Sequence, residues 1–228
     1  MNAQQKTALA SAMQDRPLVA ILRGISPEEV EAVGDALVEA GFKMIEVPLN
    51  SPRPWQSLER LVKRMPEDVL VGAGTVLDVA DVERLGSLGA SLLITPNIDA
   101  DIVEAGKAQE LASFIGCMTP SEALMAARSG ATALKLFPAA RLGVGYFSDV
   151  SAILPSDLPV FAVGGVNRDN MADWHAAGVR GFGFGSNLYQ PGRHPDEVGT
   201  AATSLVAEWQ RLEALAAQID RTEREEDA

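Results

Sequence analysis

The sequence predicts an α/β fold, a single (β/α)8 barrel of the TIM type with an extra N-terminal helix. Eight short apolar runs alternate with amphipathic segments along the 228 residues. Successive runs begin roughly 20 to 27 residues apart, the length that a strand, a helix and two short loops need. Eight such units are the number that closes this type of barrel.

The eight expected strands occupy the apolar runs. In chain order they are Leu18–Leu22, Met44–Leu49, Val69–Val76, Ser91–Thr95, Ala112–Met118, Ala133–Phe137, Val160–Val163 and Gly181–Gly185. Helix start signals follow several of them, namely Ser26-Pro27-Glu28-Glu29, Asp78 and Thr119-Pro120-Ser121-Glu122. Glycine favours the backbone conformation that ends a helix, and four glycines stand where helices should end. These are Gly41, Gly89, Gly130 and Gly178.

We expect residues 1–228 to form one domain. Residues 1–16 are predicted to be the extra helix before the barrel, and residues 221–228 to be a frayed tail. A doubly wound open sheet is the main alternative fold. It is disfavoured by the count of eight units, and because no glycine-rich dinucleotide-binding turn follows the first strand.

Composition limits the classes of partner. The formal net charge of -12 makes nucleic acid and anionic membranes poor general partners, although a local cationic site for an acidic metabolite remains open. No stretch approaches the roughly 20 apolar residues of a membrane span, and no apolar segment typical of a signal peptide is found. We therefore expect a cytoplasmic protein. The single cysteine, Cys117, excludes an intrachain disulfide and a cysteine metal cluster, and is expected in a buried strand.

Lys135 is the most informative candidate for a catalytic residue. It is the only one of the five lysines that lies inside an apolar strand-like run, Ala133 to Pro138. An ammonium group in that setting must be paired or have its pKa lowered. A desolvated lysine can attack a carbonyl group and form a Schiff base. The alternative is a buried ion pair that serves only the structure.

Glu46 is the second charge inside a strand-like run. Side-chain alternation places Glu46 on one face with Met44 and Pro48, and Lys135 on one face with Ala133 and Phe137. Both charges can therefore point into the barrel, where a carboxylate and an amine should meet. Such a carboxylate could move protons beside an imine, and the alternative is again a structural salt bridge.

Further polar residues and glycines follow the strands at the barrel face that carries active sites in this fold. Arg23 and Gly24 follow the first strand, Gly74 and Thr75 the third, and Thr95-Pro96-Asn97 the fourth. The loops after the seventh and eighth strands, Gly164-Gly165-Val166-Asn167 and Gly185-Ser186-Asn187, match the usual phosphate cradle. Arg23 could add charge for a phosphate or a carboxylate.

Several chemistries are disfavoured. His175 and His194 lie in a helix-like stretch and a late loop, so neither stands at a strand end with acidic residues at metal-ligand spacing. We expect no metal and no cofactor. No nucleophile elbow or P-loop appears. The tryptophans are expected to pack in the core rather than to stack on bases.

Six strings, taken together and in order from about Pro17 to Tyr189, resemble the class I 2-keto-3-deoxy-6-phosphogluconate and 2-keto-3-deoxy-6-phosphogalactonate aldolases. They are Ala20-Ile21-Leu22-Arg23-Gly24-Ile25, Ile45-Glu46-Val47-Pro48-Leu49-Asn50-Ser51-Pro52, Val71-Gly72-Ala73-Gly74-Thr75-Val76, Thr95-Pro96-Asn97, Leu134-Lys135-Leu136-Phe137-Pro138 and Phe161-Ala162-Val163-Gly164-Gly165-Val166. The resemblance implies that a phosphorylated keto acid is cleaved, that Lys135 forms the Schiff base, and that Glu46 transfers protons. It also implies a homotrimer. Expected substrate contacts are Arg23, Thr75, Pro96, Val163, Gly164, Gly165, Gly185 and Ser186.

Two departures resemble the galactonate branch of this family. Gluconate enzymes look to carry an arginine after the second strand and a threonine before the two glycines of the seventh loop, where this chain has Asn50 and Val163. We therefore expect 2-dehydro-3-deoxy-6-phospho-D-galactonate as the main substrate. The alternatives are the gluconate epimer as main substrate, a phosphate-sugar isomerase or epimerase, and a barrel that binds a metabolite without catalysis.

Overall fold

The computed structural model describes residues 1–226 and contains a closed barrel of eight parallel strands, each paired with the next and β8 paired with β1. The predicted (β/α)8 fold is confirmed. The strands are β1 (Leu18–Ile21), β2 (Met44–Pro48), β3 (Leu70–Gly74), β4 (Leu92–Ile94), β5 (Ala112–Cys117), β6 (Ala133–Leu136), β7 (Val160–Val163) and β8 (Gly181–Phe184).

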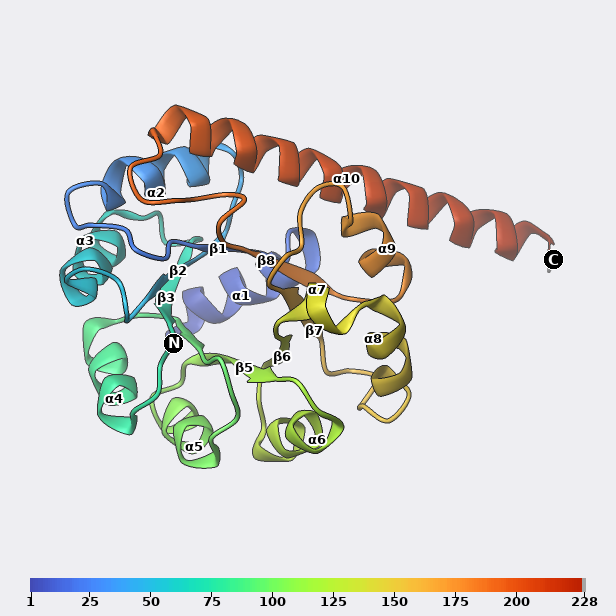
Figure 1. Ribbon diagram of the computed structural model, residues 1–228, viewed down its shortest axis with the longest axis horizontal. Coiled ribbons are helices and arrows are strands. Elements are labelled where there is room, and N and C mark those ends of the chain that lie inside the picture. Colours follow the sequence, from blue (N-terminus) through green and yellow to red (C-terminus); the bar gives the residue numbers. More distant parts are fainter. Residues whose placement is uncertain (227–228) are drawn as a thin grey trace.

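Helices surround the strands (Figure 1). They are α1 (Ala3–Asp15), α2 (Val30–Glu39), α3 (Pro54–Arg64), α4 (Val79–Leu88), α5 (Ala100–Ala108), α6 (Pro120–Ser129), α7 (Ala139–Leu142), α8 (Val144–Ser151), α9 (Met171–Ala176) and α10 (Pro195–Glu226). Two short helices, α7 and α8, fill the connection between β6 and β7. Within residues 1–226, no helix combines the length and the apolar composition that crossing a bilayer requires.

Alternation along each strand separates two apolar layers. Residues such as Ile45 and Leu134 face outward and pack against the helices, in one continuous core. Residues such as Met44 and Ala133 face inward and form the barrel interior. Glu46 and Lys135 therefore belong to the inward rows, two positions along from Met44 and Ala133, as the sequence predicts.

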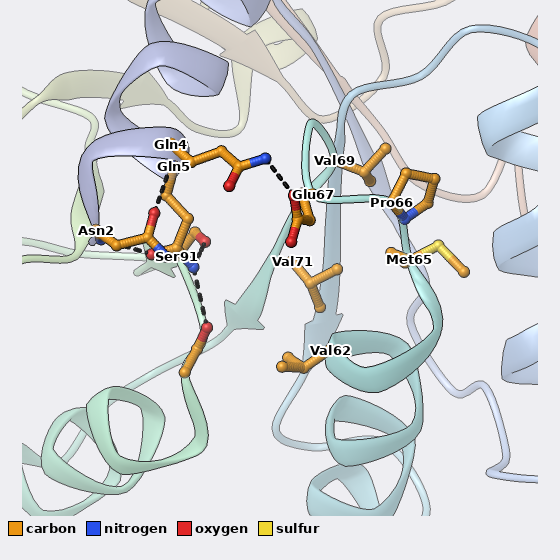
Figure 2. Close-up of a pocket in the computed structure, with 11 residues that line it drawn as sticks. Asn2, Gln4, Gln5, Val62, Met65, Pro66, Glu67, Val69, Val71 and Ser91 are labelled. Carbon is orange, nitrogen blue, oxygen red and sulfur yellow. Dashed lines mark hydrogen bonds between the residues drawn. The ribbon is translucent and has the colours of Figure 1, made fainter.

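The predicted N-terminal helix, α1, closes the amino end of the barrel. It lies behind the strands in Figure 1, and its Ala8 and Ala12 are buried against the interior apolar residues. The side chain of Asn2 caps the helix by accepting a hydrogen bond from the Gln5 N–H at 2.8 Å. Gln5 also donates to the Ser91 hydroxyl at 2.9 Å, across a small cavity of about 180 Å³ (Figure 2). These bonds hold α1 to the barrel end.

The last helix, α10, extends beyond the barrel (Figure 1). Residues 221–228 are predicted to be a frayed tail; α10 runs to Glu226, and residues 227–228 lie outside the described part. Leu212 is buried in the core, whereas Leu215 and Ile219, further along the helix, are exposed. The helix continues because its sequence is rich in Ala, Leu, Gln, Glu and Arg, which have high helix propensity even without burial.

Gly72→Ala tests the tight contact between β3 and β4. A Cβ atom at Gly72 would lie 2.0 Å from the Leu92 carbonyl oxygen, which is backbone and cannot move aside. We expect the substitution to lower the free energy of unfolding by more than about 3 kcal/mol, measured by urea denaturation. Gly145→Ala in α8 is the control, because nothing lies within 4 Å of its Cβ position. Equal stability of the two variants would contradict the packing described here.

Candidate active site

The predicted site residues gather at the carboxyl ends of the strands. A cavity of about 930 Å³ opens there, and every predicted residue except Glu46 lines it. The predicted residues in its wall are Arg23, Thr75, Pro96, Lys135, Val163, Gly164, Gly165, Gly185 and Ser186. Glu46 lines a narrow space of about 10 Å³ deeper in the barrel, which shares Lys135 and Val163 with the cavity. The structure thus brings the whole predicted set together.

Lys135 is the buried lysine at the floor of this cavity, with 6% of its surface exposed. Burial lowers the pKa of Lys135, the charge of Glu46 opposes this shift, and the charge of Arg23 adds to it. The Lys135 Nζ atom lies 5.4 Å from the centroid of the Phe137 ring. Lys6, Lys43 and Lys63 instead form ion pairs at the surface. Burial therefore favours the neutral amine form of Lys135.

Glu46 is buried even more completely, with 1% of its surface exposed. Burial raises the pKa of Glu46, while the charges of Lys135 and Arg23 oppose the shift. The Oε2 atom has no hydrogen-bond partner among the described residues. Among the described residues, Glu46 and Lys135 form no ion pair within 4.0 Å. The two charges influence each other's pKa, but they do not form the salt bridge that was the alternative interpretation. Both groups are thus driven toward their neutral forms.

Gly74 leaves the space that the Glu46 carboxyl group occupies. A Cβ atom at Gly74 would lie 2.2 Å from Oε2 of Glu46. Thr75, the next residue, has a φ of 56°, a left-handed conformation that is strained for a β-branched residue. The end of β3 therefore combines a glycine that leaves space for the Glu46 side chain with a strained backbone conformation at Thr75.

Arg23 is the exposed cation of the cavity wall, and two neighbours orient it. Its Nη1 donates to Oδ1 of Asn50 at 2.9 Å, and its Nη2 lies 3.5 Å from the Thr75 hydroxyl. Asn50 stands after β2, so the contact joins the first three strand ends. The guanidinium group is held where an anionic ligand can reach it.

Pro96 is fixed in the wall by a buried threonine. The Thr95 hydroxyl donates to the Asn97 carbonyl at 2.6 Å and accepts from the Gly116 N–H at 3.1 Å. A Cβ atom at Gly116 would lie 2.2 Å from the Pro96 carbonyl carbon, so the turn rests directly on β5. The turn after β4 is therefore rigid.

The two glycine loops form the opposite wall. Gly164 and Gly165 have φ values of 95° and 78°, which glycine adopts without strain. Gly165 also approaches α7 closely, since its Cβ would lie 2.6 Å from Cβ of Ala140. Ser186 is exposed at the cavity mouth. Backbone in this conformation can present N–H groups to an anion.

Sequence reasoning did not find every residue of the cavity wall. Tyr189, Gln190 and Pro191, which follow β8, also line it. The Tyr189 hydroxyl is buried without a partner among the described residues, and burial raises the pKa of Tyr189 to about 12. These residues come from a loop that folds back over β1, and no spacing in the sequence signals that path.

The histidines lie outside the cavity. His175 contacts Glu213 with 2.8 Å between Nε2 and Oε1, and packs edge-on against Trp209. His194 lies 3.3 Å from Asp196. Within the described residues, no group of three His, Cys, Asp or Glu side chains could hold a metal ion. The cavity's own chemistry is that of an amine, a carboxyl group, a guanidinium group and glycine-rich backbone.

Comparison with known proteins gives consistent relatives. The chain matches the sequence model of the KDPG and KHG aldolases over residues 9–197. It is 47% identical to a probable 2-dehydro-3-deoxy-6-phosphogalactonate aldolase of Rhizobium meliloti (strain 1021), over 85% of this chain and 91% of that protein. It is 42% identical to the 2-dehydro-3-deoxy-6-phosphogalactonate aldolase of Escherichia coli (strain K12), over 83% and 93%. A solved structure of native KDPGal superposes with a TM-score of 0.85, 40% identity and coverage of 87% and 96%.

Lys135→Met tests whether the buried amine costs stability. Because burial lowers the pKa of Lys135, the unfolded chain binds a proton at neutral pH that the folded chain resists, so stability should rise with pH. We expect the variant to gain about 1 to 3 kcal/mol at pH 7, measured by urea denaturation, and the gain to shrink toward about pH 10.

Lys63→Met is the matched control, because Lys63 is exposed and forms an i,i+4 pair with Glu59. Its stability should stay within about 0.5 kcal/mol of the wild type at both pH values. A loss of stability in Lys135→Met would mean that Lys135 holds the core together.

Proposed function

The chain belongs to the KDPG and KHG aldolase family, and on this premise we propose that it is a carbon–carbon lyase that cleaves 2-dehydro-3-deoxy-6-phospho-D-galactonate. The products are pyruvate and D-glyceraldehyde 3-phosphate. The observation that carries the mechanism is Lys135, whose pKa is lowered by burial at the floor of a cavity walled by two glycine loops. A neutral amine is what a Schiff-base aldolase requires at its first step.

The reaction begins with attack of the neutral Lys135 amine on the C2 ketone, which forms a C–N bond and a carbinolamine. Glu46 donates a proton to the departing hydroxyl, and water leaves as a protonated imine forms. The raised pKa of Glu46 suits this step, because burial favours the protonated carboxyl group that can donate. The protonated imine then draws electrons from the adjacent carbon.

Cleavage follows between C3 and C4. Glu46, now a carboxylate, removes the proton of the C4 hydroxyl, and the C3–C4 electron pair moves into the imine to give an enamine. D-glyceraldehyde 3-phosphate departs. Glu46 returns its proton so that C3 becomes a methyl group, and hydrolysis of the imine releases pyruvate and restores Lys135.

The remaining residues hold the substrate at both ends. The backbone of Gly164, Gly165 and Gly185 and the Ser186 hydroxyl bind the phosphate, and Arg23 supplies positive charge. On the pyruvate side lie Thr75 and Pro96, beside the floor that holds Lys135. Val163 adds an apolar contact near C4. The family resemblance further supports a homotrimer, and the chemistry uses no metal or cofactor.

Trapping with borohydride tests the covalent step. Incubation with pyruvate and sodium borohydride should add one reduced pyruvyl group at Lys135, located by digestion and mass spectrometry, because reduction locks the imine. Lys135→Met should take up none, while Lys63→Met should react as the wild type does. Labelling of Lys43 or Lys63, or activity without any labelling, would refute the Schiff-base mechanism.

Glu46→Gln tests proton transfer. The amide has the same size but cannot accept the C4 hydroxyl proton, so we expect kcat to fall by about 100- to 10,000-fold. Pyruvate trapping at Lys135 should persist, which shows that the fold and the amine are intact. A near-normal kcat would make Glu46 a structural residue.

Substrate choice is tested at Val163. The wild type should cleave the galactonate substrate at least as efficiently as its C4 epimer, and Val163→Thr should shift the ratio of kcat/KM values toward the gluconate epimer by about 1 to 3 kcal/mol at most, since one hydroxyl is added. Steady-state kinetics with both epimers measures the ratio. A strong wild-type preference for the gluconate epimer would assign the chain to the other branch.

A further inference from the structure

The first three carbonyl groups of the loop after β7 all accept hydrogen bonds from protein donors. The Gly164 carbonyl accepts from the Ala140 N–H at 3.0 Å. The Gly165 carbonyl accepts from Nδ2 of Asn170 at 3.0 Å, and the Val166 carbonyl accepts from Nδ2 of Asn187 at 3.0 Å. Three consecutive peptide oxygens are therefore fixed by protein donors.

The N–H groups of the same loop face the other way. Because the C=O and N–H of a trans peptide point in opposite directions, the bonds to the Gly164 and Gly165 carbonyls turn the N–H groups of Gly165 and Val166 away from Ala140 and Asn170. No acceptor among the described residues bonds these two N–H groups. Gly165 and Val166 both line the cavity. Two backbone donors are thus left for an anion.

Asn170 controls the second of these donors from behind the loop. Its Oδ1 accepts from the Asn167 N–H at 2.8 Å while its Nδ2 donates to the Gly165 carbonyl, so both ends of one amide are used. Asn170 is absent from the lining of the cavity. Any effect of this side chain on a ligand must therefore pass through the backbone that it holds.

Asn187 ties the loop after β8 to the loop after β7. Its side-chain Nδ2 donates to the Val166 carbonyl, and its backbone carbonyl accepts from Nη1 of Arg193 at 3.1 Å. The same Arg193 atom donates to the Leu188 carbonyl at 2.9 Å. The separation of the two glycine loops is therefore set by side chains rather than by the strands alone.

We propose that Asn170 and Asn187 are positioning residues that set the phosphate-binding end of the cavity, Asn170 by aiming the Val166 N–H and Asn187 by fixing the spacing of the two loops. The proposal rests on the proposed function for its ligand, the phosphate of the sugar acid. In this proposal, the side-chain amides of Asn170 and Asn187 hold the loop backbone so that it binds the phosphate of the substrate.

Neutral substitutions of similar size test this role. We expect Asn170→Leu and Asn187→Leu to raise KM for 2-dehydro-3-deoxy-6-phospho-D-galactonate by about 10- to 100-fold, with kcat changed by less than about threefold. The unphosphorylated analogue, 2-dehydro-3-deoxy-D-galactonate, should keep its kcat/KM within about twofold, because it lacks the group that the cradle holds. Asn170→Leu is decisive, since Asn170 cannot touch the ligand.

Asn2→Leu is the matched control. It makes the same change at the opposite end of the barrel and also removes a side-chain bond to backbone, the cap of α1 (Figure 2). Its effect should be on thermal stability alone, with the KM values of both substrates unchanged. If Asn170→Leu fails to fold, Asn170→Ser replaces it, because serine is neutral and too short to span both bonds.

Binding of glycerol 3-phosphate, followed by calorimetry, tests the cradle without the reaction. We expect the affinity to fall about tenfold in both asparagine variants. In the kinetic test, the proposal would be overturned if Asn170→Leu lowered kcat/KM equally for the phosphorylated and the unphosphorylated substrate, or lowered it for neither. If the wild type cleaves neither substrate and yet binds glycerol 3-phosphate, with an affinity that falls in both asparagine variants, the proposed function fails and the cradle stands.

Discussion

The cost of placing an amine and a carboxyl group inside an apolar barrel governs this molecule. Lys135 and Glu46 are both withdrawn from water, and burial is the largest influence on the pKa of each. Because no direct ion pair joins these two described residues, burial favours the neutral form of each. Burial of these two groups has an unfavourable desolvation free energy, which the rest of the fold must offset.

Glycine and strained backbone make that placement possible. Gly74 gives the Glu46 carboxyl group its space, and the strained Thr75 follows at once. Gly183, on β8, leaves space for the Val163 side chain, whose Cγ2 atom would lie 2.8 Å from a Cβ atom at Gly183. The interior is thus asymmetric, with apolar packing at the amino end and chemistry at the carboxyl end.

Much of the fold and of the site could be predicted from the sequence, because strand alternation, helix caps and a lysine in an apolar run are local signals. Tyr189 and Asn170 illustrate what could not. The sequence singles out Asn50 but not its bond to Arg23, 27 positions away, and no local signal shows that Asn170 bonds the Gly165 carbonyl. In α10, Leu215 and Ile219 are exposed, so the helix beyond Leu212 depends on local helix propensity more than on burial.

Helix α1 covers the amino end of the barrel, and this position bears on the order in which ligands bind and leave. Ala8 and Ala12 are buried against the interior residues at one end, and the cavity lies at the other. Lys135 lies at the floor, and the glycine loops lie at the rim. Under the proposed mechanism, the pyruvyl fragment is bonded to Lys135, so the aldehyde leaves first, and in the reverse direction the keto acid binds first. The proposal thus implies an ordered kinetic sequence.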